Sequence, residues 1–555
     1  MCNEEMLVAK AAGQVNSEQK TSLAAALPQY VHKALAAFND RGFQAYVVGG
    51  AVRDLLLGKE PHDFDITTDA RPEETVKICQ SLGWGANDKL GNNFGCVLAL
   101  AGAEQLEITT FRGERYSDAD AHRPAEVWFT DDLREDLSRR DFTINALAID
   151  RNGRIYDYFG GQQDLQKKIL RTVGKAKERY TEDGLRMLRA CRFVAQLGFD
   201  YVQEEGVLPP FGQEGTPYYL PHCFDFPVER VEGLSFERVY RELDKLLVAP
   251  YAGKGLMLMM ATGLCDCSCR MKRFGVVSQV AILPELRHLV GLPQNPRFHC
   301  YDVWEHTLLA IDNAPRDLAI RWALLLHDIG KGLPEIRRLN KEGQPTDPGH
   351  EAKSAEMAAE IFHRYHYPKG FRKLVIWLIA KHMRFAPMLI TGEKTLLRWV
   401  RSEARSGAFQ RQEYLVDAYE KLVQVFLSDM GATHARENHK LMEEGRLIGE
   451  QVVALARERM PVAYSDLAVS GDELLKFCSQ RKIKAVYQFL LLSVQNGNLP
   501  NEKPVLIRAA KKHLNRLRNA VYNMKKLQAE QARLAKEKAA QTGGCKDRNQ
   551  SKEQE

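Results

Sequence analysis

Residues 46–68 form the stretch that most constrains how this 555-residue chain folds, YVVGGAVRDLLLGKEPHDFDITT. The apolar residues 46–48 predict a buried strand, and Gly49 with Gly50 predicts a turn. Residues 51–57 then predict a helix that carries Arg53 and Asp54 in its first turn. Backbone amides at such a turn, a helix N-terminus and a nearby Arg together can hold a phosphate group. The stretch therefore predicts a phosphate cradle at the end of a strand.

Carboxylates follow this cradle closely. Asp63 and Asp65 are expected on a second strand, where a period of two places both side chains on one face. In LEITTF, residues 106–111, the same alternation places Glu107 opposite the apolar Leu106 and Ile108. Two anionic ligands beside a phosphate cradle suit Mg²⁺, and a third carboxylate completes a metal-dependent transfer site. Taken singly, each feature is more common as a tight turn or a solvated strand edge.

In this order, the glycine pair, the Arg-Asp pair and the double Asp resemble the first motif of the nucleotidyltransferases that include tRNA CCA-adding enzymes and bacterial poly(A) polymerases. The resemblance implies an α+β protein with a polymerase-beta-like head. It also implies that Asp63, Asp65 and Glu107 are catalytic, that Asp63 and Asp65 bind Mg²⁺, and that Gly50 and Arg53 contact the nucleotide.

Two further motifs extend the resemblance. The segment RRDFTINA contains Arg139, Arg140, Asp141 and Asn145, and it implies Arg side chains on the triphosphate and Asp141 on a ribose hydroxyl. It follows a polar loop, residues 112–135, which resembles the flexible loop of CCA-adding and A-adding enzymes that CC-adding relatives lack. This loop argues against CC-only addition.

The segment EDGLR begins an expected helix from about Thr181 to Phe199, with an apolar face at Leu185, Leu188, Cys191, Phe193 and Val194. Its polar face alone would indicate only salt bridges between residues three or four apart. The resemblance instead implies that Asp183 and Arg186 read the Watson–Crick edge of the incoming base. Arg189 and Arg192, on the same helix, are expected to contact the nucleotide.

A second site is predicted further along the chain. In ALLLHDIGKG, His327 and Asp328 end an apolar helix, a place where charge is normally excluded. The pattern resembles the HD phosphohydrolases, which implies a transition metal such as Ni²⁺, Mn²⁺ or Co²⁺ and a phosphatase or phosphodiesterase activity. Any single His here would more often be an ordinary core or surface residue. The expected ligands are His306, His327, Asp328, His350, His382 and Asp417.

Composition fits several domains in a reducing, cytoplasmic setting. The chain has a net charge of +6, 11 cysteines, no signal peptide and no apolar run that could span a membrane. Cys265, Cys267 and Cys269 lie close together, but their spacing is not that of a zinc site, which favours a structural role. Basic residues gather at 508–526, which indicates either a polyanionic partner or a solvated amphipathic helix.

These observations predict six regions: a flexible N-terminus at 1–27, a nucleotidyltransferase head at 28–150, a helical neck at 151–245, an HD body at 246–430, a helical tail at 431–525 and disorder at 526–555. The predicted reaction adds CMP and AMP from CTP and ATP to the 3′ end of tRNA. The alternatives are an A-adding enzyme or poly(A) polymerase and, from another class, a catalytically dead RNA-binding scaffold. No role is predicted for residues 201–233.

Overall fold

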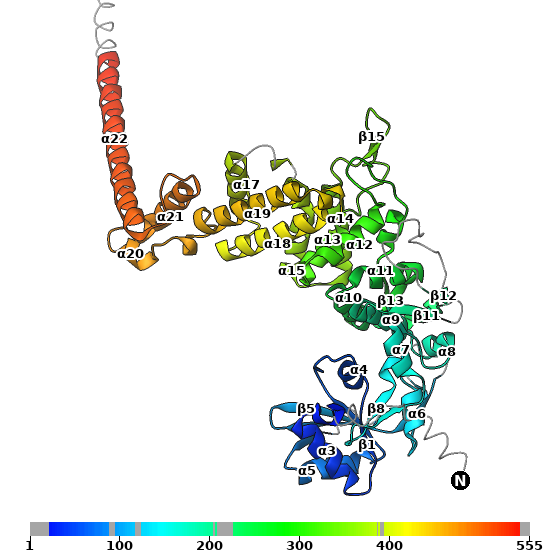
Figure 1. Ribbon diagram of the computed structural model, residues 1–555. Coiled ribbons are helices and arrows are strands. Elements are labelled where there is room, and N and C mark those ends of the chain that lie inside the picture. Colours follow the sequence, from blue (N-terminus) through cyan, green and yellow to red (C-terminus); the bar gives the residue numbers. More distant parts are fainter. Residues whose placement is uncertain are drawn as a thin grey trace, which may run out of the picture. The chain divides into compact units, whose positions relative to one another are not determined.

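A computed structural model of the chain describes residues 22–87, 95–116, 124–203, 206–207, 226–385, 387–388 and 393–543 (Figure 1). The chain divides into two compact units. The first contains residues 1–380 and 428–437, and the second contains residues 381–427 and 438–555. The predicted head and neck therefore lie in one unit with most of the predicted HD body.

A seven-stranded sheet forms the centre of the head. Its strand order is β3-β4-β5-β2-β1-β8-β9, and among its pairings only β2 with β5 is parallel in the described residues. The strands are β1 (Ala45–Val48), β2 (Asp65–Thr68), β3 (Gly85–Asn87), β4 (Cys96–Ala101), β5 (Glu104–Thr110), β8 (Leu147–Ile149) and β9 (Ile155–Asp157). The predicted strands at 46–48, 97–100 and 106–111 are confirmed.

Helices α3 (Gln29–Asn39), α4 (Gly50–Leu56) and α5 (Pro72–Ser81) accompany this sheet. In α3, Val31, Leu35 and Phe38 recur at helical spacing and are fully buried. Their apolar stripe anchors the helix beside β1 and α5. The sheet with its helices confirms the α+β fold class of the head.

The polar stretch at 112–135, predicted as a loop, is more ordered than expected. β6 (Arg112–Arg115) and β7 (Glu126–Phe129) pair as an antiparallel hairpin, and α6 (Leu133–Ser138) follows. Residues 117–123, at the centre of the predicted flexible loop, lie outside the described residues. The prediction of a loop is therefore wrong for the two strands and the helix that flank this centre.

The helix predicted from Thr181 to Phe199 is broken. α8 (Ala176–Glu182) ends at Asp183, whose backbone is extended, and α9 (Leu185–Leu197) begins two residues later. All five predicted apolar positions of α9 are buried. α7 (Gly161–Lys167), β10 (Ile169–Leu170), β11 (Asp200–Gln203) and β12 (Gly206–Val207) complete this region.

The rest of the first unit is mainly helical. α9 packs against α10 (Phe236–Leu247) and α11 (Ala252–Ala261), and α11 packs against α12. The helices that follow are α12 (Val303–Asn313), α13 (Leu318–Leu326), α14 (His350–Tyr365) and α15 (Lys369–Lys381). Two hairpins interrupt them, β13 (Ser268–Arg273) with β14 (Val276–Ala281), and β15 (Arg338–Leu339) with β16 (Pro345–Thr346).

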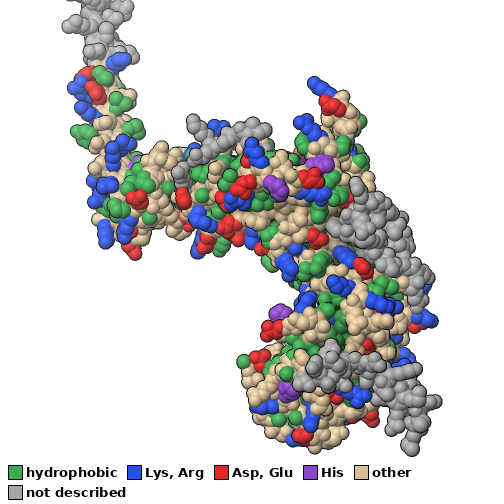
Figure 2. Space-filling model, in the orientation of Figure 1, with side chains coloured by type: hydrophobic (Ala, Val, Ile, Leu, Met, Phe, Trp, Pro, Cys, Tyr) green, Lys and Arg blue, Asp and Glu red, His purple; other side chains and the backbone are tan. Residues whose placement is uncertain are grey.

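The second unit is helical throughout its described part. It contains α17 (Glu393–Arg405), most of α18 (Gln412–Met430), α19 (His439–Arg459), α20 (Gly471–Leu475), α21 (Gln480–Gln495) and α22 (Lys503–Gly543). Leu474, Val486, Leu490 and Leu506 belong to one buried cluster that joins α20, α21 and α22. Lys and Arg side chains gather around these three helices (Figure 2). Because α22 continues to Gly543, the predicted disorder is wrong for residues 526–543.

Within the described ranges, none of the helices combines the length and apolar character needed to cross a bilayer. The three close cysteines serve the packing of the β13 region. Cys265 and Cys269 are buried free thiols, and Cys269 Sγ lies 3.7 Å from the Val280 carbonyl across the hairpin. Among the described residues, neither group of at least three metal-capable side chains includes them, and their structural role stays a prediction.

Candidate active site

Three carboxylates, Asp63, Asp65 and Glu107, lie close enough to interact electrostatically at one edge of the sheet. Asp65 opens β2 and stands in register with Glu107 on the parallel strand β5. Asp63 precedes β2 by two residues, so it is not on the strand as predicted, yet it lines the same cavity as Asp65. Burial, Glu107 and Asp63 raise the pKa of Asp65 to about 6, and Arg140 opposes the shift. This mutual repulsion is what a cation between them would relieve.

Gly49 and Gly50 bring the backbone close to two Arg side chains. Gly49 has φ of 74°, a conformation that favours glycine, and a Cβ there would lie 3.1 Å from Nη1 of Arg140. Arg53, in the first turn of α4, donates from Nη1 to Asn145 Oδ1 at 2.8 Å. This hydrogen bond links the start of α4 to the RRDFTINA segment.

Asp141 accepts hydrogen bonds on both of its carboxylate oxygens. Its Oδ1 accepts from the Phe142 backbone N–H at 2.8 Å and from Asn145 Nδ2 at 3.1 Å. Its Oδ2 accepts from Nε of Arg189 at 2.8 Å. Although burial works in the opposite direction, Arg189 and these bonds lower the pKa of Asp141 to about 2. Asp141 is therefore ionised and fixed in orientation near neutral pH.

Arg186 is held by the protein on one side only. Nη1 donates to the Arg179 carbonyl at 3.1 Å and to Glu182 at 2.6 Å, and Nη2 donates to the Arg139 carbonyl at 2.8 Å. A guanidinium has five N–H donors, so Nε–H and one Nη2–H have no protein acceptor among the described residues. Asp183 is placed beside it by the break between α8 and α9, and its Oδ1 accepts from Leu185 N at 3.0 Å.

These groups open into one cavity of about 670 Å³. Every predicted nucleotide-contacting residue lines it, namely Gly50, Arg53, Arg140, Asp141, Asn145, Asp183, Arg186, Arg189 and Arg192, together with Asp63 and Asp65. Arg192 reaches it from α9, where it pairs with the buried Glu242 of α10. A polar cavity with this excess of Arg fits a polyanion that also carries a hydrogen-bonding ring.

The predicted HD ligands His306, His327 and Asp328 meet in the core of the first unit. In His306, His327 and His350, Nδ1 faces a backbone carbonyl, of Ala432, Leu324 and Asp347 respectively, at 2.7–3.1 Å. Since a carbonyl only accepts, each Nδ1 carries the proton and each Nε2 presents its lone pair. The Nε2 atoms of His327 and His350 lie 3.2 and 3.1 Å from Asp328. Such backbone-oriented imidazoles beside carboxylates fit a divalent transition metal.

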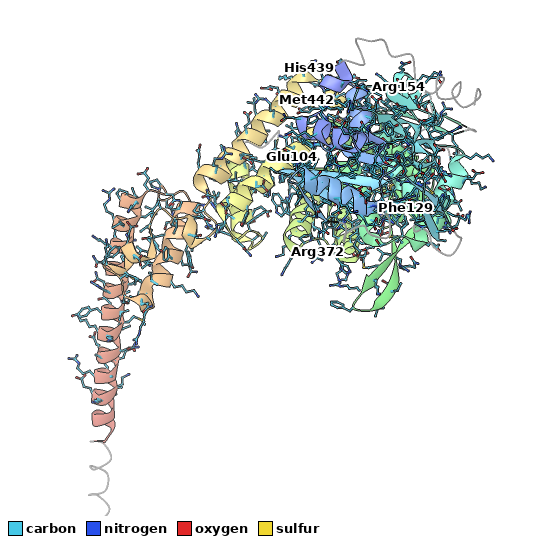
Figure 3. The ribbon with its side chains drawn as sticks, turned by 90° about the horizontal axis from the view of Figure 1, so that it is seen from below. Glu104, Phe129, Arg154, Arg372, His439 and Met442 are labelled. Carbon is cyan, nitrogen blue, oxygen red and sulfur yellow. The ribbon has the colours of Figure 1, made fainter. Side chains whose placement is uncertain are left out.

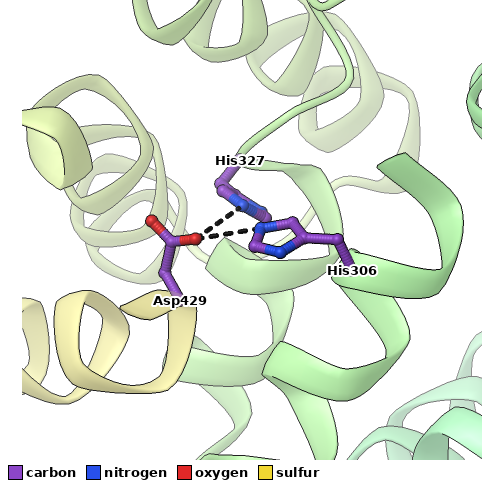
Figure 4. Close-up of side chains that lie close together, drawn as sticks. All are labelled: His306, His327 and Asp429. Atoms are coloured by element: carbon purple, nitrogen blue, oxygen red, sulfur yellow. Dashed lines mark ion pairs between the residues drawn. The ribbon is translucent and has the colours of Figure 1, made fainter. Parts of the chain in front are cut away.

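Among the described residues, the predicted ligand Asp417 does not group with these histidines, whereas Asp429, which was not predicted, does. Asp429 Oδ1 lies 2.9 Å from His306 Nε2 and 3.8 Å from His327 Nε2 (Figure 4). Ligand atoms of these three residues all lie within 4.8 Å of one another. Asp417 has a half-exposed side chain that pairs with Lys421. His382, the remaining predicted ligand, is a buried residue at the start of the second unit, and its part in this site stays a prediction.

Comparison with known families identifies both regions. Residues 45–171 match the poly A polymerase head domain, and residues 298–458 match the HD domain. Residues 228–267 match the family described as probable RNA and SrmB-binding site of polymerase A. The chain is thus similar to a poly A polymerase head domain in one region and to an HD domain in another.

Curated relatives of this head domain are CCA-adding enzymes. The chain is 39% identical over 289 residues to the CCA-adding enzyme of Streptococcus pyogenes serotype M2. The aligned region covers 51% of this chain and 65% of that enzyme. It is 39% identical over 272 residues to that of Streptococcus sanguinis, covering 49% and 61%. The chain thus spans just under two thirds of the length of these relatives. A Bacillus stearothermophilus CCA-adding enzyme, solved in complex with CTP, is 25% identical with a TM-score of 0.55, covering 89% of this chain and all of that one.

Sequence reasoning missed several residues of the head-domain cavity. Glu114 and Tyr116 line it from the β6 strand and the residue after it, and Arg238 lines it from α10. Arg112 and Arg139 both pair with Glu114, whose carboxylate also accepts from the Tyr116 hydroxyl at 2.7 Å. The signal available was the alternation of Arg112, Glu114 and Tyr116, which is typical of a strand with one functional face.

Proposed function

We propose that the protein adds CMP and AMP, from CTP and ATP, to the 3′ end of tRNA in the cytoplasm and releases pyrophosphate. The observation that carries the proposal is the single cavity that joins Asp63 and Asp65 to Asp183 and Arg186. It places the predicted metal ligands and the predicted base-reading pair around one volume large enough for a nucleotide. The CCA-adding relatives support the same assignment.

In this proposal, Asp63, Asp65 and Glu107 hold Mg²⁺. When bound, the ion would lower the pKa of the attacking 3′ hydroxyl and neutralise charge on the phosphates. Arg53 and Arg140 bind the triphosphate, for which Arg140 is well placed because its Nε is buried without a hydrogen-bond partner among the described residues. Asp141 retains acceptor capacity for a ribose hydroxyl, since a carboxylate has about four lone-pair positions.

Base selection is assigned to Asp183 and Arg186. The three bonds that hold Arg186 leave it two N–H donors, which suit the ring nitrogen and carbonyl of cytosine. Asp183 accepts from an exocyclic amine, which both cytosine and adenine carry and uracil lacks. Because the guanidinium is fixed before the nucleotide arrives, little ordering entropy is lost on binding.

The test uses three tRNA transcripts that end before CCA, after C and after CC, each incubated with the protein, Mg²⁺ and CTP, ATP or both. Growth of all three to a defined CCA end is the expected result. A variant with Asp63→Ala and Asp65→Ala is the control and should extend none of them.

Other outcomes would identify one of the alternative functions. Growth of only the CC-ended transcript, by a single A, would make the protein an A-adding enzyme. Long A tails on unrelated RNA would make it a poly(A) polymerase. No extension with any transcript, together with tight RNA binding, would favour the scaffold.

A second function is proposed for the HD domain, as a metal-dependent phosphatase or phosphodiesterase that uses Ni²⁺, Mn²⁺ or Co²⁺. The observation that favours it is the backbone-oriented set of His306, His327 and His350 beside Asp328. Lys331, whose Nζ lies 2.7 Å from Asp328, supplies a cation near the place where a phosphate would sit.

Two Asp residues of α18 provide a matched test of this second function. Asp429→Asn should abolish phosphate release from a 2′,3′-cyclic or terminal phosphate and reduce bound metal measured by mass spectrometry. Asp417→Asn should behave like the wild type in both assays. A double variant with His327→Ala and Asp328→Ala that kept full phosphatase activity would count against the proposal.

A further inference from the structure

A second cavity of about 430 Å³ lies in the first unit, at residues that neither proposed site uses. Its lining comes from the start of α10, the end of β13 and the residues that follow α14. The lining residues are Phe236, Glu237, Tyr240, Met271, Lys272, Arg273, Tyr365, His366, Tyr367 and Pro368. α10 thus serves both cavities, since Arg238 lines the first one and Tyr240 the second.

Aromatic rings form the walls of this cavity. Tyr240 lies 6.0 Å from Tyr367 between ring centroids, and Tyr365 and Tyr367 are roughly parallel at 6.4 Å. The Tyr365 hydroxyl donates to the Ile282 carbonyl, and the Tyr367 hydroxyl donates to Asp244. Tyr365 is buried, whereas Tyr240 and Tyr367 are partly exposed, so these two rings are available to a ligand. Flat apolar walls of this kind suit a planar heterocycle.

Cations without acidic partners border the same cavity. Lys272 and Arg273 line the cavity, and Arg372 lies near its His366 without lining it. Among the described residues, none of the three takes part in an ion pair. Arg273 instead contacts His366, at 3.0 Å from its Nη1 to a ring nitrogen, and Arg372 (Figure 3) acts electrostatically on the same His. The Nε of Arg372 is buried without a hydrogen-bond partner in the part of the chain described. Cations that make no ion pair favour an anion, although Glu237 also lines the cavity.

An exposed aromatic ring stands next to these cations. Phe274 lies at the tip of the β13–β14 hairpin, 93% exposed, with φ of 48°. A non-glycine residue in this left-handed region is strained, and an exposed Phe does not offset the strain by burial. The Arg273 guanidinium lies over its ring at 5.1 Å. The hairpin therefore presents a second stacking surface beside the cavity.

We propose that this cavity binds a nucleotide unit, with the base stacked against Tyr240 or Tyr367 and the phosphate at Lys272 and Arg273. Glu237, the acidic side chain among the lining residues, accepts from an amino group of the base. The nucleotide is either free or part of a single-stranded RNA, since the two share this chemistry. This binding does not require the proposed transfer reaction.

The experiment measures binding to the full-length protein in EDTA, where no transfer occurs. The probes are a fluorescein-labelled 12-nucleotide single-stranded RNA and the photoreactive nucleotide 8-azido-AMP. Tyr240→Ala and Arg273→Glu should each weaken binding about fivefold or more, the factor that corresponds to the loss of one stacked base or one phosphate contact. The charge-matched control Lys341→Glu, at the exposed β15–β16 turn, should bind like the wild type.

Further variants separate binding from folding. Tyr240→Phe keeps the ring and Arg273→Lys keeps the charge, so both should bind nearly as well as the wild type. Cross-links from 8-azido-AMP should map to peptides that contain Tyr240 or Tyr367. Competition by AMP against the RNA would identify a free nucleotide as ligand, and competition by oligonucleotides alone would identify an RNA strand. Wild-type affinity of Tyr240→Ala and Arg273→Glu for both probes, with cross-links elsewhere, would overturn the proposal.

Discussion

The ionised Asp65 that the proposed catalysis needs lowers the stability of the folded protein. Its pKa is raised from 3.8 to about 6 by burial, Glu107 and Asp63. A raised carboxyl pKa means that the folded state binds the proton more tightly than the unfolded state. Protonation of Asp65 therefore stabilises the folded state fully below about pH 4, and this stabilisation is lost as the pH rises through 6.

Asp65→Asn should therefore stabilise the metal-free protein at pH 8, by about 1–3 kcal/mol, while transfer activity is lost. The measurement is urea unfolding in EDTA of the wild type and the variant at pH 8 and near pH 4. The difference should become small near pH 4, where the wild-type carboxyl is protonated in the folded state. A variant that is less stable than the wild type at pH 8 would contradict the assignment.

Asp417 and Asp429 show what the sequence could and could not predict at the level of single residues. Both are on α18, and the apolar pattern around each predicts a helix correctly. Twelve residues at 100° per residue turn the helix by 120° beyond whole turns, so the two side chains point in different directions. Tertiary packing decides which face of α18 lies against His306. By contrast, the positions of Asp65 and Glu107 follow from the period of a strand, which leaves only two faces.

At the scale of elements, the junction between α8 and α9 sets the position of the base-reading pair. Gly184 sits between Asp183 and Arg186, and a Cβ there would lie 2.9 Å from the Arg230 carbonyl. The obstacle is backbone, so it cannot rotate away. Gly184→Ala should lower the free energy of unfolding by about 1–3 kcal/mol and displace α9 from the cavity. The expected functional result is weaker discrimination of CTP against UTP, measured as the ratio of kcat/KM values.

Gly370 offers a matched control for this prediction. It lies at the start of α15, and a Cβ there would meet nothing within 4 Å. Gly370→Ala should leave nucleotide discrimination unchanged and stabilise the helix by up to about 1 kcal/mol. If Gly184→Ala matched Gly370→Ala in stability and in discrimination, the junction would not position the pair.

The hairpins were the elements that sequence reasoning did not predict. β6 and β13, RGER and SCRMKR, consist largely of polar residues, which by composition resemble a solvated loop. In the structure, ion pairs of Arg112 and Arg139 with Glu114 bury the polar face of β6. The Arg139–Glu114 pair joins residues far apart in the chain, and the local alternation of Arg112, Glu114 and Tyr116 alone does not report it. Long helices and apolar strands were predictable because their burial repeats within one element.

At the scale of the whole molecule, the charge of the chain is unevenly distributed. α22 carries eight Lys and Arg residues and no Asp or Glu from Lys503 to Lys526, although the net charge of the protein is only +6. Leu506, Ala510 and Leu514 bury one face of this segment against the tail core. The basic residues at its far end, including Lys525 and Lys526, are exposed. A fixed, exposed array of cations favours the polyanionic partner over the alternative of a merely solvated helix.

This array predicts how tRNA affinity depends on salt. Lys525→Glu with Lys526→Glu should weaken tRNA binding and reduce the slope of log K against log[salt] by roughly 1–2, because each phosphate contact contributes about 0.7–0.9. The charge-matched control is Arg338→Glu with Lys341→Glu, in the β15–β16 hairpin, and its slope should equal that of the wild type. At saturating tRNA, kcat should be unchanged in both variants, since neither pair lines the head cavity. An unchanged slope in the first variant would instead make the end of α22 a solvated helix, and the tRNA phosphates would then have to be held elsewhere.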